Sequence, residues 1–308
     1  MRISSLRASL FIALVPLALV IGACSAGGTT ASAPSPTPTI VPNATVLRVE
    51  QSQHFTDSKS GGTSAPCANG DPLINGDCGE TVTAQCASGD VILSGGYAVD
   101  DPLAFVTSSF PASGSTWTVT AHDEGQDGGS HAVTVIAYAA CLHSNVDAGV
   151  AAVSSTPPIP SDSSPHEVSQ NCPAGTIVTG GGFRGTNGTG ESLPSPTGWT
   201  AALSVQLKGS AKPQLFAVCA KNHLMAASQP KSTADPVLGS GDDLTVACPA
   251  GALLVGGGGH TVGYGNITIL APDSGVAHWQ LRVSASGAVG GPVATYSVAD
   301  YAVCATFS

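Results

Sequence analysis

Acidic residues and histidines are the side chains of this chain that could perform acid–base chemistry, and they form short local groups. Asp100 and Asp101 are adjacent, and His122 is followed directly by two acids. A glycoside hydrolase needs two carboxyl groups about 5–9 Å apart across a sugar. Asp100, Asp101 and His122 are the first residues that could supply such a pair. The sequence has no His-Glu-x-x-His or Gly-x-Ser-x-Gly motif, so it names no catalytic residue.

The segment 123–128 carries oxygen ligands at a spacing that resembles the start of an EF-hand calcium loop. Asp123 and Asp127 lie four residues apart, and a glycine occupies the sixth position. The third and twelfth positions, Gly125 and Thr134, depart from that pattern. Asp123 and Asp127 are therefore candidate metal ligands in an incomplete loop, and a solvated acidic loop is the competing interpretation.

The N-terminal segment up to Cys24 has the form of an export signal. Arg2 and Arg7 precede an apolar run over 10–21 that is too short for a membrane span. The ending Ile-Gly-Ala-Cys24 resembles the lipobox of bacterial lipoproteins. In that family the cysteine is acylated after cleavage before it, so the resemblance implies a signal peptide over 1–23 and a lipid anchor at Cys24. An ordinary secretory signal with a chance cysteine is the alternative.

Composition favours an exported β-protein. Residues 24–44 are rich in Ser, Thr, Ala, Pro and Gly and predict a flexible tether behind the lipid anchor. The net charge is −10, and loss of two signal arginines gives −10 − 2 = −12. Such a chain repels phosphate, so we expect no nucleic-acid partner. The many glycines and prolines (38 and 22) favour turns and strands over long helices.

The cysteines predict a disulfide framework. Nine are present, and eight remain when Cys24 carries lipid. Spacing favours pairing within three similar segments, whereas pairing between neighbouring segments (Cys141–Cys172, Cys219–Cys248 and Cys86–Cys304) is the alternative. The favoured pairs, with one extra bridge in a Gly/Asn-rich loop, are Cys86–Cys141, Cys172–Cys219, Cys248–Cys304 and Cys67–Cys78.

A recurring pattern indicates three internal repeats, predicted over 45–143, 144–221 and 222–308. In each repeat a cysteine precedes a short strand that ends in glycines, and a tryptophan and a second cysteine follow at nearly constant spacing. The period of about 80 residues is longer than a solenoid unit and suits a group of four to six strands. The recurring residues are Cys86, Trp117 and Cys141, then Cys172, Trp199 and Cys219, then Cys248, Trp279 and Cys304.

Alternation of apolar and polar residues around each tryptophan predicts strands, as in the run from Trp117 to Ala121. No stretch of ten residues has a helical period. Glycine inside a strand marks a bulge or a close approach of another group. We therefore expect each tryptophan ring to lie over a glycine floor, and a glycine-rich ligand loop is the competing hypothesis. The runs lack the Lys-Ser/Thr of a phosphate loop, and we expect no cofactor.

The predicted fold class is all-β, with three disulfide-stapled repeats. Repeat number, strand count and cysteine use resemble the three-fold β-prism of the vitelline membrane outer layer protein and, more distantly, jacalin-type lectins. That resemblance implies one closed three-sheet arrangement. Three small β-sandwiches on a string are the alternative, because Pro/Ser-rich linkers separate the segments.

The main functional hypothesis is a lipid-anchored, non-catalytic surface protein that binds carbohydrate or an envelope polymer, or acts purely as a structural spacer. Aromatic residues after the glycine runs could stack on sugar rings, although packing in the core is the role that the sequence favours for each of them. These candidates are Tyr97, Phe183 and Tyr264. The expected partners are the membrane, through the lipid, and the polymer. A secreted hydrolase acting on cell-wall glycan is the alternative function.

Overall fold

The computed structural model describes residues 43–56, 79–102, 104–123, 132–160, 162, 164–186, 191–204, 212–234, 242–262, 265–285 and 297–308. These residues form nineteen strands in three antiparallel sheets, which confirms the all-β prediction. Within this described part, no helical segment has the length and apolar character that a bilayer crossing requires.

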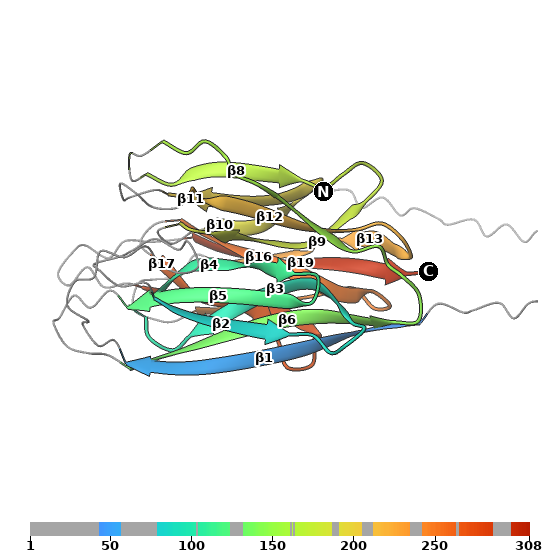
Figure 1. Ribbon diagram of the computed structural model, residues 1–308, viewed down its shortest axis with the longest axis horizontal. Coiled ribbons are helices and arrows are strands. Elements are labelled where there is room, and N and C mark those ends of the chain that lie inside the picture. The colour runs from blue at the N-terminus through green and yellow to red at the C-terminus, as the bar shows by residue number, and fades with distance from the viewer. Residues whose placement is uncertain are drawn as a thin grey trace, which may run out of the picture. The chain divides into compact units, whose positions relative to one another are not determined.

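The first sheet has six strands in the order β1-β6-β3-β17-β18-β15. The thirteen residues of β1 pair with β6 along their whole length, and the two strands lie side by side in Figure 1. Its strands are Ala44–Thr56 (β1), Ala132–Ser144 (β6), Val91–Val99 (β3), Gly265–Pro272 (β17), His278–Ala285 (β18) and Asp242–Ala247 (β15).

The second sheet also has six strands, in the order β2-β5-β4-β9-β12-β7. Its strands are Glu80–Gln85 (β2), Thr116–Asp123 (β5), Ala104–Ser113 (β4), Ile177–Arg184 (β9), Gln214–Ala220 (β12) and Ala151–Ser155 (β7).

The third sheet has seven strands, in the order β13-β19-β16-β10-β11-β8, with β14 also paired to β19. Its strands are Leu224–Ser228 (β13), Ser297–Phe307 (β19), Leu253–Val262 (β16), Glu191–Ser195 (β10), Gly198–Leu203 (β11), His166–Asn171 (β8) and Lys231–Ala234 (β14).

Each sheet is assembled from two parts of the chain that are distant in sequence. The first sheet joins β3 to β17, the second joins β4 to β9, and the third joins β10 to β16. Few residues pair at these junctions. Across them Tyr97 lies opposite Leu270, Phe183 opposite Ser109, and Gly259 opposite Ser192. Because no sheet is made from one predicted segment alone, three independent sandwiches on a string are excluded.

Three disulfides connect the sheets in pairs. Cys86 follows β2 of the second sheet and is bonded to Cys141 in β6 of the first, with the Cα atoms 5.7 Å apart. The bond between Cys172 and Cys219 joins the third and second sheets, and Cys248 and Cys304 join the first and third. The favoured sequence pairing is confirmed for these six cysteines. Cys24, Cys67 and Cys78 lie outside the described residues.

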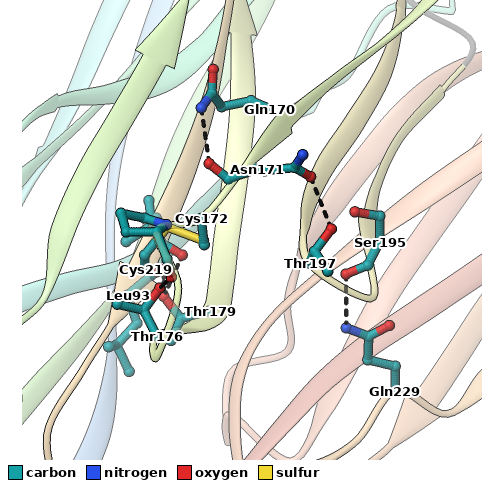
Figure 2. Close-up of a disulfide and its surroundings, with 12 residues drawn as sticks. Leu93, Gln170, Asn171, Cys172, Thr176, Thr179, Ser195, Thr197, Cys219 and Gln229 are labelled. Carbon is teal, nitrogen blue, oxygen red and sulfur yellow. Dashed lines mark hydrogen bonds between the residues drawn. A yellow bond between two sulfur atoms is a disulfide. The ribbon is translucent and has the colours of Figure 1, made fainter.

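The glycine-containing strands of the three sheets meet inside one hydrophobic core. Ser94 of β3 donates a hydrogen bond from its hydroxyl to the Val255 carbonyl of β16 (2.8 Å). Thr179 of β9 donates to the Leu93 carbonyl of β3 (2.8 Å), beside the Cys172–Cys219 disulfide (Figure 2). These contacts between sheets satisfy buried polar groups and fix how the sheets pack.

Candidate functional site

The three tryptophans are fully buried, and each lies over a glycine of another sheet. A Cβ atom added at Gly95 would lie 2.2 Å from the Trp117 ring, and at Gly181 it would lie 2.2 Å from the Trp199 ring. Gly257 has the same relation to Trp279, at 2.3 Å. The glycine-floor prediction is thus confirmed, because any side chain at these positions would occupy the space of the ring.

The hydrogen bonding of the indole nitrogens differs among the three sites. Trp117 Nε1 donates to Ser109 Oγ (2.9 Å), and Trp199 Nε1 donates to Ser192 Oγ (3.0 Å). Trp279 Nε1 is buried and has no hydrogen-bond partner. The register explains the difference: Leu270 stands two residues before a proline that pairs with the tryptophan, where the other two sites have serine.

A second difference lies two residues beyond each floor glycine. Tyr97 pairs with Ala137 of β6, and Phe183 pairs with Leu215 of β12. The third sheet has Gly259 opposite Asp300 at this register. At this register the third sheet therefore has no aromatic ring, and it has a carboxyl group where the other two sheets have an apolar side chain.

The space of the missing ring is taken by leucines from the first sheet. A Cβ atom at Gly259 would meet Leu281 Cδ1 at 2.7 Å and Leu270 Cδ1 at 2.9 Å. Directly opposed residues of an antiparallel pair project their side chains to the same face. The leucines and the Asp300 carboxyl consequently share one face of the third sheet.

Asp300 is the most unusual titratable group among the described residues. The residue is fully buried, and neither carboxylate oxygen makes a hydrogen bond of ordinary geometry. Burial raises the pKa of Asp300 to about 9, against a smaller lowering effect of the Tyr301 backbone amide. The carboxyl group is therefore protonated at neutral pH, since an unpaired charge in this interior is costly.

Two of the three predicted sugar-stacking residues are part of the core. Tyr97 and Phe183 are 2% and 1% exposed, so the prediction that they stack on a ligand at the surface was wrong. Desolvation by burial also raises the pKa of the Tyr97 phenol well above its usual range. The physical reason is that their strands pack against other strands on both faces. Tyr264 lies outside the described residues.

The candidate metal loop is only partly described by the structure. Asp123 is the last residue of β5, and Asp127 lies outside the described residues. No group of three or more His, Cys, Asp or Glu side chains that could hold a metal ion occurs among the described residues.

The first candidates for hydrolysis are the two aspartates between β3 and β4 and a histidine of β5. Asp100 follows β3 of the first sheet, and its carboxylate accepts a hydrogen bond from the Thr134 amide (2.6 Å). Asp101 follows it in the chain. His122 belongs to β5 of the second sheet, is 1% exposed and stacks on Phe105 at 5.6 Å between ring centroids. These contacts explain Asp100 and His122 as structural residues.

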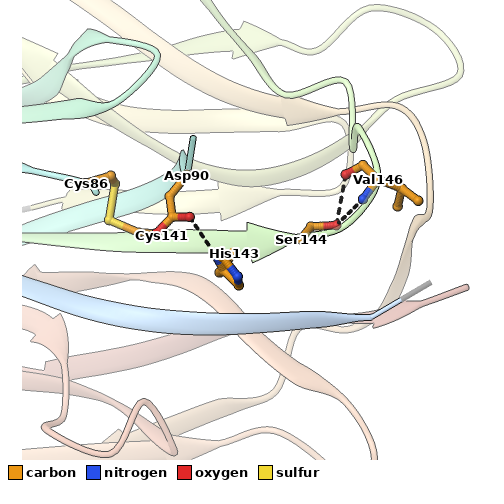
Figure 3. Close-up of polar contacts among 6 residues, drawn as sticks. All are labelled: Cys86, Asp90, Cys141, His143, Ser144 and Val146. Atoms are coloured by element: carbon orange, nitrogen blue, oxygen red, sulfur yellow. Dashed lines mark hydrogen bonds and ion pairs between the residues drawn. A yellow bond between two sulfur atoms is a disulfide. The ribbon is translucent and has the colours of Figure 1, made fainter. Parts of the chain in front are cut away.

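Another buried acid is paired close to a disulfide. Asp90 and the exposed His143 approach to 2.7 Å between Oδ1 and Nδ1 (Figure 3). The Cys86–Cys141 disulfide lies beside this pair, because Cys141 precedes His143 by two residues in β6. Asp90 therefore contrasts with Asp300, since its side chain has a partner in reach.

Sequence reasoning missed a set of aromatic–cation pairs. Every sheet has an aromatic residue three positions before the second half-cystine of a disulfide, and a cation lies near this residue or near the ring stacked on it. Arg48 lies 4.4 Å from the Tyr138 ring, and Lys231 lies 5.3 Å from the Tyr301 ring. In the second sheet Phe216 stacks on Phe110, which has an arginine at 5.1 Å. The recurring Tyr/Phe before the cysteine was the available signal, but the cations come from other strands.

Compared with models of known protein families and with curated proteins, the chain matches none. Its function must therefore be inferred from its own residues.

Proposed function

We propose that this protein is a non-catalytic, lipid-anchored component of a bacterial cell surface. Cys24 would carry the lipid, the part of the predicted linker 24–44 that precedes β1 would form the tether, and the sheets would stand outside the membrane. The main observation in support of this proposal is that three disulfides connect three sheets in pairs. Disulfides of this kind persist in oxidising compartments, which indicates an extracytoplasmic environment.

The organisation of the body supports a further part of the proposal, that three copies of one unit form a prism-like arrangement. In each sheet a strand with a half-cystine pairs with a glycine strand, which then meets the neighbouring group of strands. The same order of strand types recurs in all three sheets. A body whose sheets are joined by disulfides is expected for a structural protein outside a cell.

The binding version of the proposal is that the surface recognises an envelope polymer. With Tyr97 and Phe183 in the core, its support comes from Tyr301, which is partly exposed beside Lys231. A ring and a nearby ammonium group together suit a sugar that carries an acidic substituent. Tyr301 therefore replaces the residues first proposed from the sequence.

Two experiments test this function. Cells fed a labelled fatty acid should incorporate it into the wild-type protein and not into a Cys24→Ser variant; label in both would contradict the anchor. A glycan and cell-wall polymer array should give binding that Tyr301→Ala reduces at least tenfold. An array without signal for the wild-type chain would remove the binding version and leave the structural one.

A further inference from the structure

Asp300 is a carboxyl group in a position where the rest of the molecule uses apolar side chains. It lies on β19 between Ser232 of β14 and Gly259 of β16. The residues at the same register in the other two glycine-strand pairs are Ala137 and Leu215, both fully buried. A chain that only needed to fill this space could therefore use an apolar residue, and Asp300 weakens the fold whenever it must ionise.

The leucines that pack against Gly259 offer the Asp300 carboxyl group no polar partner. Both of its oxygens are buried and make no hydrogen bond of ordinary geometry, and the effect of the Tyr301 backbone amide is smaller than that of burial. Thr261, on the same face of β16 two residues beyond Gly259, also has a buried hydroxyl without a partner. A neutral carboxyl group is tolerated in such surroundings far better than a carboxylate, which would need a cation or several donors.

Charged groups on the strands around β19 are engaged elsewhere. The strand β13 carries no charged residue. The strand β15 carries two acids, of which Asp242 pairs with Val283 of β18. The groups on β16, β10, β14, β15, β18 and β9 have other contacts, which are His260 with Glu191, Lys231 with the Tyr301 ring, Asp243 with Arg282, His278 with Asp273, and Arg184 with the Phe110 ring. None of these cations therefore serves as a counter-ion for Asp300.

We propose that Asp300 couples the folding of this protein to the pH of its surroundings, so that the contribution of this residue to the stability of the body falls as the pH rises. The folded state is favoured when the buried carboxyl group holds its proton. The strands stabilised in this way are β19 and its neighbours β14 and β16. An extracytoplasmic protein meets the external pH directly. The inference goes beyond the proposed function and does not depend on the lipid anchor.

The sign follows from the two states of the group. The pKa of Asp300 is raised to about 9 in the folded protein, whereas an unfolded aspartate has a pKa of about 3.9. Below the unfolded value both states hold the proton, so Asp300 adds no dependence on pH. Between the two values only the folded state holds it, so the folding equilibrium constant falls about tenfold for each pH unit. Above pH 9 this dependence ends.

The test is urea unfolding of the purified full-length chain with its disulfides intact, followed by tryptophan fluorescence between pH 5 and pH 8. The variants are Asp300→Asn and Asp300→Leu, the latter copying Leu215. Because the wild type and the variants share every other titratable group, each variant is compared with the wild type at each pH. We expect the ratio of folding constants to shift by about 1,000-fold over these three pH units, with the variants gaining relative to the wild type.

The matched control is Glu167→Gln, which removes an exposed carboxyl group from β8 of the same sheet and should leave the pH dependence unchanged. A constant ratio between the wild type and both Asp300 variants would overturn the proposal, and so would loss of the pH dependence in Glu167→Gln. If neither Asp300 variant folds, carbon-13 NMR of the wild-type carboxyl groups decides. A carboxyl that titrates near pH 9 supports the proposal, and titration of every carboxyl below pH 6 overturns it.

Discussion

Trp117 and Trp279 occupy equivalent surroundings in the first and third parts of the chain, but their polar groups are treated differently. Both rings are fully buried over a glycine of another sheet. Trp117 has a serine hydroxyl for its indole nitrogen, whereas Trp279 has Leu270 at that register and no partner. The first site therefore satisfies its buried donor, and the third exchanges that hydrogen bond for apolar volume.

The exchange is linked to the residue beyond the glycine floor. Tyr97 fills the first site with a ring, while Gly259 leaves room that Leu270 and Leu281 occupy. Apolar side chains fill the space in both regions, as close packing requires. Polar satisfaction is not, because Trp279 and Asp300 both retain unpaired polar atoms. Packing is thus the shared requirement, and hydrogen bonding is the property that varied.

The largest expected effect tests what the two regions share. A Cβ atom at Gly96 would lie 1.8 Å from the carbonyl oxygen of Leu270, and a Cβ atom at Gly258 would lie 2.3 Å from the carbonyl oxygen of Ser192. Gly96→Val and Gly258→Val should each lower the free energy of unfolding by about 4 kcal/mol or more, because a backbone atom must move. Gly114→Ala, which has open space around it, should change it by less than about 0.5 kcal/mol. Urea titration measures all three, and a tolerated Gly96→Val would refute the close approach.

Loss of a disulfide should come next and should be equal in the two regions. The Cys86–Cys141 and Cys248–Cys304 bonds close loops with sequence separations of 55 and 56. Replacing both cysteines of either bond by alanine should cost about 4 kcal/mol, since similar loops restrict the unfolded chain similarly. Calorimetry of the two double variants checks this. Clearly unequal losses would show that strain or local packing, and not the loop, governs their contribution.

A smaller effect should separate the two tryptophans. Ser109→Ala leaves the Trp117 indole nitrogen buried without an acceptor, which should cost about 1–3 kcal/mol. In a Trp117→Phe background the same serine substitution should cost much less, because the donor is absent. Trp279→Phe should also be milder than Trp117→Phe by about 0.5–1.5 kcal/mol. Equal losses for the two tryptophans in urea unfolding would mean that the Ser109 hydrogen bond adds nothing.

The smallest effect contrasts a surface acid of the third region with Asp300. The Arg282 guanidinium donates to the Asp243 carboxylate (Nη2–Oδ2 2.7 Å), and this hydrogen bond lowers the pKa of Asp243. Because the folded pKa is the lower one, the stabilisation is present above pH 4 and is lost as the pH falls. Asp243→Asn should cost about 0.2–1 kcal/mol at pH 7, less at high salt. The pH dependence is thus opposite in sign to that of Asp300, and chemical denaturation at pH 3 and pH 7 tests it.

The sequence alone predicted the local features of this fold. The Cys-to-Trp-to-Cys spacing favoured the pairing of Cys86 with Cys141 and the two later pairs over pairing between segments, and the structure has the favoured pairs. Alternation around Trp117 predicted the strand β5 and its buried face. The glycine run predicted a close approach, since glycine in a strand usually has that cause. Each of these inferences depends on neighbours in sequence or on a recurring local motif.

The roles of Tyr97 and Phe183 could not be predicted in the same way. Both follow glycine runs, where the sequence left sugar stacking at the surface and packing in the core as alternatives. The strands continue, and β3 is buried at nearly every position because another strand covers each face. Whether a residue next to a glycine lies at the surface depends on which distant strand packs there. Gly96, for example, approaches Leu270 of β17, a strand from the last third of the chain.

The amino-acid order thus indicated the strands and their inward faces through a two-residue period, and it favoured the half-cystine pairs through repeated spacing. Tertiary structure alone decided that β3 pairs with β17, β4 with β9 and β10 with β16. It also decided that Asp300 would lie opposite Gly259 with no partner. Such pairings depend on how three sheets share one interior, and no local pattern records which distant strand will occupy a given face.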